Sequence, residues 1–190
     1  MGQDEEIVKK RKAWVPFAVR AAISPIPAIL LIHKFLSPQE PSYFPFYMGT
    51  YFLANGLLTF KVAKAESTKT RGAVLAALVS IIGGLMLMAL LPFYKLGLLP
   101  TDVYVPVISP IVILIGLLQL RGAVHITPQP VVKQAHIAFG FMEVLLGVVL
   151  IIFPNDWMGD AILFIWLILV SIYMAYVAHH LRNIVGTDIG

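Results

Sequence analysis

Six apolar stretches follow one another along the chain, separated by short connections rich in Pro, Gly, Thr and Asp. A helix of about 20 apolar residues crosses the core of a bilayer, so the pattern predicts six transmembrane helices. A membrane barrel needs alternating segments of about 10 residues, and the continuous Leu, Ile and Val runs exclude it. The predicted spans are residues 14–36, 44–63, 71–91, 103–123, 135–153 and 160–181.

The composition agrees with an all-α membrane protein. Hydrophobic residues make up 59% of the 190 residues and charged residues 13%, whereas soluble domains carry about 25% charged residues. We therefore predict a single transmembrane domain at residues 14–182, between a basic tail at 1–13 and a C-terminal tail at 183–190. The chain has no cysteine, which excludes disulfides, thiolate metal sites and thiol catalysis.

Lysine and arginine lie mainly on one side of the predicted spans. Lys34 and Lys95 lie on the other side, and Arg20 lies inside the first span. By the positive-inside rule, the distribution predicts cytoplasmic termini, and it explains the net charge of +4 better than nucleic-acid binding does. The basic residues on the predicted cytoplasmic side are Lys9, Lys10, Arg11, Lys12, Lys61, Lys64, Lys69, Arg71, Arg121, Lys133 and Arg182.

A repeat of about 55 to 60 residues groups the spans into three hairpins, as expected when one unit is duplicated. The second helix of each hairpin ends in a similar phrase: NGLLTFK at 55–61, IGLLQLR at 115–121 and VSIYMAY at 170–176. The hairpins have the same orientation, so we predict parallel duplication rather than the inverted repeats of many transporters.

The fifth and sixth spans carry a resemblance to a known family. Residues 141–154 read FMEVLLGVVLIIFP, which resembles the core repeat of HdeD-type membrane proteins. The resemblance is closest over residues 135–182 and weaker over 72–123 and 13–63. It implies six spans with cytoplasmic termini, and an association with acid resistance in bacteria.

Three polar residues are expected to share one layer inside the membrane. Counting about 1.5 Å per residue from the cytoplasmic ends, Arg20 lies about 9 Å deep, and Asn55 and Glu143 lie about 12 Å deep. Ionisable residues at such depths usually face the protein interior. The layer is either a structural pair of Arg20 with Glu143 or a proton-responsive functional site. Alternatively, the Arg20 side chain extends to the headgroups.

Small residues predict close helix packing. Gly140, Glu143 and Gly147 share one face of the fifth span, and Ser80, Gly83 and Gly84 form a similar stretch in the third. Small residues let neighbouring helices approach closely. We interpret both stretches as packing faces.

Histidines and prolines allow further interpretations. His136 is either a solvated helix end or a titrating group. Metal binding would require His125, His136 and His179 to converge, which the sequence does not predict. Pro25 and Pro27 predict a kink in the first span, with a broken-helix ion site as the alternative.

The sequence contains no phosphate loop, zinc-protease motif or serine-hydrolase motif. We therefore predict no catalytic residues, no metal and no cofactor. The leading hypothesis is a non-enzymatic, HdeD-like protein of acid or envelope stress. The alternative is an accessory subunit of a larger photosynthetic or respiratory membrane complex, and small-solute transport is a third hypothesis. The expected partners are lipid and other membrane subunits or further copies of the chain.

Overall fold

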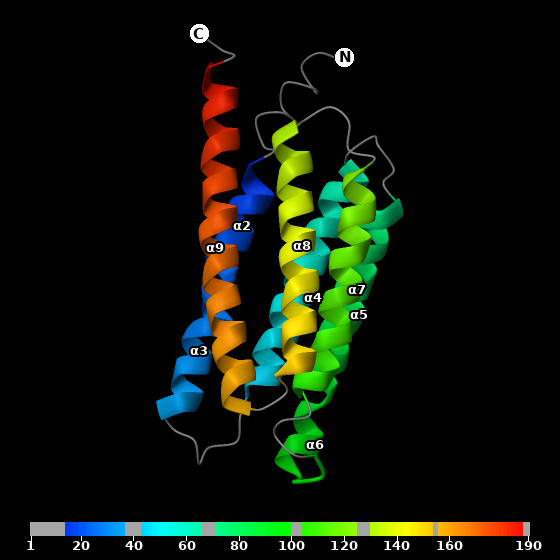
Figure 1. Cartoon of the computed structure of the whole chain (residues 1–190), viewed down its shortest axis with the longest axis vertical. Coiled ribbons are helices and arrows are strands. Elements are labelled where there is room, and N and C mark those ends of the chain that lie inside the picture. The colour runs from blue at the N-terminus through cyan, green and yellow to red at the C-terminus, as the bar shows by residue number, and fades with distance from the viewer. Residues whose placement is uncertain are drawn as a thin grey trace.

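The computed structural model describes residues 14–36, 43–65, 71–99, 104–124, 130–153 and 156–187. These residues are almost entirely helical and contain no strand, which confirms the all-α class. The helices form an upright bundle (Figure 1). They are α2 (Val15–Ile23), α3 (Pro25–Leu36), α4 (Phe44–Ala65), α5 (Arg71–Ala89), α6 (Leu91–Lys95), α7 (Tyr104–Ala123), α8 (Pro130–Ile152) and α9 (Asp156–Thr187).

Within the described residues, five segments are long and apolar enough to cross a membrane. They confirm a multi-pass helical membrane protein. α4 is not among them, because Asn55, Thr59 and several other polar residues interrupt its apolar sequence. A sixth span therefore stays a prediction. The five segments are Val15–Ile32, Arg71–Lys95, Val105–Ala123, Lys133–Ile152 and Met158–Asn183.

The first predicted span is interrupted at Ser24, between α2 and α3. Pro25 has no N–H and its ring crowds the preceding turn, which is the expected cause. The backbone N–H and the hydroxyl of Ser24 both donate to the Arg20 carbonyl, at 3.0 and 2.7 Å. The break therefore stays hydrogen-bonded, which a membrane interior requires.

Helix ends differ from the predicted spans at several points. α8 begins at Pro130, five residues before the predicted start, because proline is well suited to the first turn of a helix. α9 continues to Thr187, into the predicted C-terminal tail. Its 32 residues extend about 48 Å, which exceeds the hydrocarbon thickness of about 30 Å. The predicted tail at 1–13 lies outside the described residues.

The long helices pack mainly against their neighbours in sequence, and the last helix packs against the first. α4 packs on α5, α5 on α7, α7 on α8, and α8 on α9, while α9 contacts both α2 and α3. The pairs α4/α5 and α7/α8 have the most extensive contacts. α2 and α3 also touch α4, so the described helices surround a common interior.

Glycines explain how closely those two pairs pack. A Cβ atom added at Gly84 of α5 would lie 2.6 Å from the Gly49 carbonyl oxygen of α4. One added at Gly116 of α7 would lie 2.6 Å from the Gly140 carbonyl oxygen of α8. No larger side chain fits at these points without a shift of the backbone, so the small residues set the distance between the helices.

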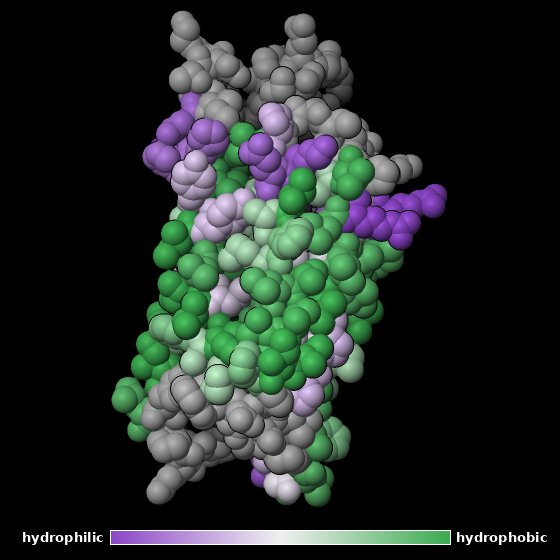
Figure 2. Space-filling model, in the orientation of Figure 1, coloured by the Kyte–Doolittle hydropathy of each residue, from purple (hydrophilic) through white to green (hydrophobic). Residues whose placement is uncertain are grey.

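The start of α2 and the end of α9 lie at the same end of the bundle, together with the end of α4, the start of α5, the end of α7 and the start of α8 (Figure 1). We call this the basic end. Figure 2 shows hydrophilic residues gathered there above a broad apolar surface. Lys95, in α6, lies towards the opposite end. The described basic residues near the basic end are Lys61, Arg71, Arg121, Lys133 and Arg182.

Candidate functional site

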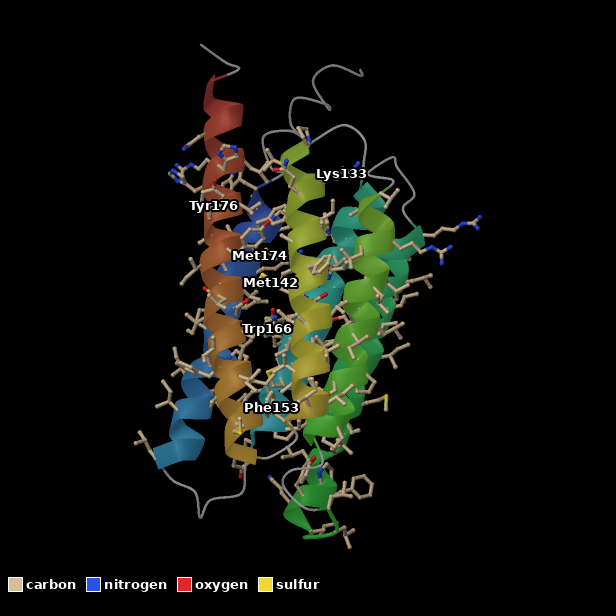
Figure 3. The ribbon with its side chains drawn as sticks, in the orientation of Figure 1. Lys133, Met142, Phe153, Trp166, Met174 and Tyr176 are labelled. Atoms are coloured by element: carbon tan, nitrogen blue, oxygen red, sulfur yellow. The ribbon has the colours of Figure 1, made fainter. Side chains whose placement is uncertain are left out.

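Buried polar side chains gather in the middle part of the bundle. They come from α2, α4, α8 and α9, and Figure 3 marks one of them, Trp166, about a third of the way along α9 from its start. We call this group the polar layer. Its members are Arg20, Tyr51, Asn55, Thr59, Glu143 and Trp166.

Arg20 faces the interior of the bundle, and only 5% of it is exposed. Its guanidinium Nη2 donates to the Thr59 hydroxyl of α4. Thr59 in turn donates to the Asn55 carbonyl at 2.8 Å. The Nε of Arg20 has no hydrogen-bond partner. The side chain therefore does not extend to the headgroups, and it links the first helix to α4.

Glu143 lies in the middle of α8 with 1% of its surface exposed. It interacts electrostatically with Arg20 and Tyr51. No ion pair joins Arg20 and Glu143 in the part of the chain that the structure describes, because the Arg20 hydrogen bond goes to Thr59. The Oε2 atom of Glu143 has no hydrogen-bond partner. A water-mediated link between the two charged groups stays a prediction.

Aromatic contacts connect the polar layer to α9. The Tyr51 ring meets Trp166 edge to face, with ring centroids 6.1 Å apart. Trp166 stacks on Phe139 of α8 at 6.4 Å. The Ser24 and Tyr51 hydroxyl oxygens are 3.5 Å apart. These contacts join Trp166 to Tyr51, which itself interacts electrostatically with Arg20 and Glu143.

Sequence reasoning missed three members of the polar layer, namely Tyr51, Thr59 and Trp166. The spacing of four residues from Tyr51 to Asn55 to Thr59 places all three on one face of α4, and that signal was available in the sequence. Trp166 had no comparable signal, because its neighbours along α9 are apolar.

Four buried atoms of the polar layer have no hydrogen-bond partner: Arg20 Nε, Asn55 Oδ1, Glu143 Oε2 and Trp166 Nε1. Leaving a buried polar atom unpaired costs about 1 to 3 kcal/mol. The Oε1 of Gln119, in α7, is a further unpartnered acceptor. The layer therefore has unused donors and acceptors, which suit a small polar guest or a proton.

The structure excludes one of the two predicted environments of His136. His136 is partly buried, and its ring meets Phe17 edge to face at 6.5 Å, so it is not a solvated helix end. It also interacts electrostatically with Arg20. His179 shares a hydrogen bond with Asn183 at 3.0 Å. His125 lies outside the described residues, among which no group of three or more His, Cys, Asp or Glu is placed to hold a metal.

The predicted packing positions all lie where helices meet. Gly84 and Gly140 take part in the close approaches described above. The Ser80 hydroxyl donates to the Phe52 carbonyl of α4 at 2.7 Å. A Cβ at Gly83 would meet a side chain of α7, and one at Gly147 would lie 2.7 Å from an α7 carbonyl oxygen. These residues hold helices together and do not contribute to the polar layer.

The half of the interior away from the basic end is mainly apolar. Among the buried residues described there, Ser109 donates to a carbonyl of its own helix at 2.9 Å, and Asp160 lies near the start of α9. The polar layer therefore does not continue as a polar path to the far end. The apolar residues of that half are Leu31, Met48, Leu87, Val105, Ile108, Leu150 and Leu163.

Comparison with protein-family models, curated proteins and solved structures gave no match to this chain. The evidence for function therefore comes from the polar layer and from the distribution of charge. The layer contains a permanent cation and a carboxyl group, both buried in segments that are apolar enough to cross a membrane.

Proposed function

We propose that this protein is a non-enzymatic, six-span protein of the bacterial inner membrane, that it is related to the HdeD-type proteins, and that it acts in acid or envelope stress. The observation that carries the proposal is Glu143, a carboxyl group buried within the electrostatic reach of Arg20. A proton bound by Glu143 changes the charge of an otherwise enclosed layer. Such a group converts acidification into a structural signal.

The proposed orientation has both termini in the cytoplasm, as the positive-inside rule requires. Its support is the cluster of basic residues at the end where α2 begins and α9 ends. α4 supplies the sixth span, because its 22 residues reach about 33 Å, enough to cross the hydrocarbon core. Reporter fusions after Gly190 and after Asn155 should give opposite sidedness. An exported C-terminus would overturn this orientation.

Parallel duplication is part of the proposal, and the glycine contacts support it. Gly56 of α4 faces the Ala77 carbonyl of α5, and Gly116 of α7 faces the Gly140 carbonyl of α8, with added Cβ atoms at 2.8 and 2.6 Å. The offsets, 60 residues from Gly56 to Gly116 and 63 from Ala77 to Gly140, are close to the repeat length in the sequence. One unit thus accounts for both helix pairs.

Acid-survival complementation tests the proposed role of Glu143. A bacterial strain with impaired acid resistance is given the wild-type protein, the Glu143→Gln variant or the matched Ser80→Ala variant. Ser80 is also buried in the bundle, but it lies on a packing face. Wild-type and Ser80→Ala proteins should protect the strain, and Glu143→Gln should not, when all three reach equal levels in the membrane. Equal protection by Glu143→Gln would refute the role of Glu143, and no protection by the wild-type protein would refute the acid-stress assignment.

The second candidate function is an accessory subunit of a larger membrane complex. Large apolar side chains on the outer faces of α5, α7 and α8 favour it, among them Leu85, Leu117 and Phe141, each at least half exposed. Such faces suit lipid and protein neighbours alike. Extraction in a mild detergent followed by sizing separates the two cases. Stable co-migration with a large complex would favour the subunit, and a small particle would favour the stress protein.

A further inference from the structure

We infer that the polar layer binds one small monovalent anion, such as chloride, together with one proton on Glu143. The inference rests on the proposed function in one respect, since it takes the polar layer as the working site of the protein. It adds a ligand class and a stoichiometry, which acid protection by itself does not require.

Arg20 carries a buried positive charge that needs a counter-charge. A guanidinium group stays protonated in proteins, and this one is buried with the neutral Thr59 hydroxyl as its hydrogen-bond partner. A buried charge without a counter-charge is strongly unfavourable. Glu143 supplies the counter-charge as a carboxylate. Once Glu143 binds a proton, the layer has a net positive charge that an anion from solution would balance.

The other helices around Arg20 supply no alternative anion in the described part of the chain. Tyr51 of α4 interacts electrostatically with Arg20, and so do Glu143 and His136 of α8. Buried polar groups on the remaining helices include Trp166 of α9, Gln119 of α7 and Ser80 of α5, which are all neutral. Asp160 lies near the start of α9, away from the basic end. Protonation of His136 would add positive charge and so favour an anion further.

Hydrogen-bond donors for an anion are already in place. Arg20 Nε and Trp166 Nε1 are buried and have no partner. The Tyr51 ring contacts Trp166, and Tyr51 interacts electrostatically with Arg20, so its hydroxyl is a third donor in the same layer. Two N–H groups and a hydroxyl are typical ligands for a halide. The stacking of Phe139 on Trp166 fills the neighbouring space, which favours a small ion over a bulky organic anion.

The charge pattern of the molecule gives the anion a side of entry. The basic end attracts anions, and clefts or ends of one charge raise the local concentration of the opposite ion. Arg20 lies about 9 Å from the start of the first helix, whereas the far half of the interior is mainly apolar. The geometry therefore fits uptake and release on one side, and it does not fit passage through the bundle.

Thermal unfolding of the purified full chain tests this inference. Chloride is compared with gluconate at equal ionic strength, in acidic and in alkaline buffer. Chloride should raise the unfolding temperature in acid, and its affinity should fall at least about tenfold in alkali, a typical coupling between two sites. In Glu143→Gln, which keeps the side chain neutral, the chloride affinity should change much less between the two buffers than in the wild type, with His136 as the remaining titratable group. The matched Ser80→Ala variant should unfold at a lower temperature but show the same chloride and pH dependence as the wild type.

Arg20→Met should lose the chloride effect. Because this variant removes a buried group and is at risk of misfolding, a second measurement uses the native Arg20. A chain with Trp14→Phe and Trp157→Phe retains Trp166 as its one tryptophan, and iodide is the quencher. Saturable quenching in acid that weakens in alkali supports the inference. Weak, linear quenching at both pH values would overturn it, as would a chloride effect that survives in Arg20→Met.

The two proposals fail separately. If Glu143→Gln loses acid protection while the wild type shows no chloride effect, the anion inference falls and the proposed function stands. If chloride binds as described but no variant alters acid survival, the anion site stands and the acid-stress assignment falls.

Discussion

Two parts of the bundle are held together in different ways. In α4, α5, α7 and α8, which we call the glycine-packed unit, neighbouring backbones touch through residues such as Gly84 and Gly116. The pair formed by α2/α3 and α9 relies on side chains instead, including a hydrogen bond from Ser171 to the Ala21 carbonyl at 2.8 Å. Its first helix is also broken at Ser24. The difference indicates that the glycine-packed unit is the more rigid part.

The polar layer lies where these two parts meet. Arg20 and Trp166 come from the α2/α3–α9 pair, and Asn55, Thr59 and Glu143 come from the glycine-packed unit. A change of charge at Glu143 therefore acts across the junction, where side-chain contacts adjust more readily than backbone contacts. This arrangement gives a buried proton a means of altering the shape of the molecule.

The largest effect is expected from Gly84→Leu in the glycine-packed unit. The new side chain would meet the α4 backbone, because a Cβ at this position would lie 2.6 Å from the Gly49 carbonyl oxygen. Overpacking of this kind should cost about 3 kcal/mol or more, measured by reversible denaturation in detergent. The control is Leu85→Ala, a change at an exposed neighbour, with an expected cost of about 0.5 kcal/mol or less. Equal costs for the two variants would contradict the close backbone contact.

Matched serine variants compare the two parts directly. Ser80→Ala removes a buried hydrogen bond within the glycine-packed unit, and Ser171→Ala removes a partly buried one within the α2/α3–α9 pair. We expect the free energy of unfolding to fall by about 1 kcal/mol in Ser80→Ala and by about 0.6 kcal/mol in Ser171→Ala. A larger loss for Ser171→Ala would reverse the proposed order of rigidity.

The smallest effect is expected from Arg182→Gln. The Arg182 guanidinium lies 5.7 Å from the centre of the Trp14 ring, and an exposed cation–π contact contributes about 0.5 to 1 kcal/mol. The free energy of unfolding, measured by denaturation, should fall by about 0.5 kcal/mol, and chloride binding should not change. A loss above about 2 kcal/mol would mean that this contact is a main attachment between the first and last helices.

Much of the fold can be predicted from hydrophobicity alone. The apolar runs predict the helices, and Pro25 predicts the break at Ser24, because both are local effects of sequence. The ends of α8 and α9 differ from prediction because helices continue into polar segments outside the membrane, where hydropathy gives no signal. α4 illustrates the opposite problem, since the polar residues that make it part of the site also weaken its signal as a span.

The candidate site was harder to predict than the fold. Depth counting selected Arg20, Asn55 and Glu143, and the structure buries all three. Depth counting did not identify Thr59 as the hydrogen-bond partner of Arg20, because the choice between a hydroxyl and a carboxylate depends on helix rotation and not on depth. The sequence left His136 as either a solvated helix end or a titrating group for a similar reason: its contact with Phe17 joins α8 to α2, and spacing within one helix carries no information about such contacts.

A double-mutant cycle on Arg20 and Glu143 tests the central claim most directly, namely that these buried charges are coupled across the junction. Arg20→Met and Glu143→Gln should each destabilise the protein by about 3 kcal/mol, since each leaves the other group without its counter-charge. The double variant should recover at least about 1 kcal/mol of the summed loss, a coupling typical of interacting residues. Additive losses, within about 0.5 kcal/mol, would contradict the account and leave Arg20 and Glu143 as independent buried groups.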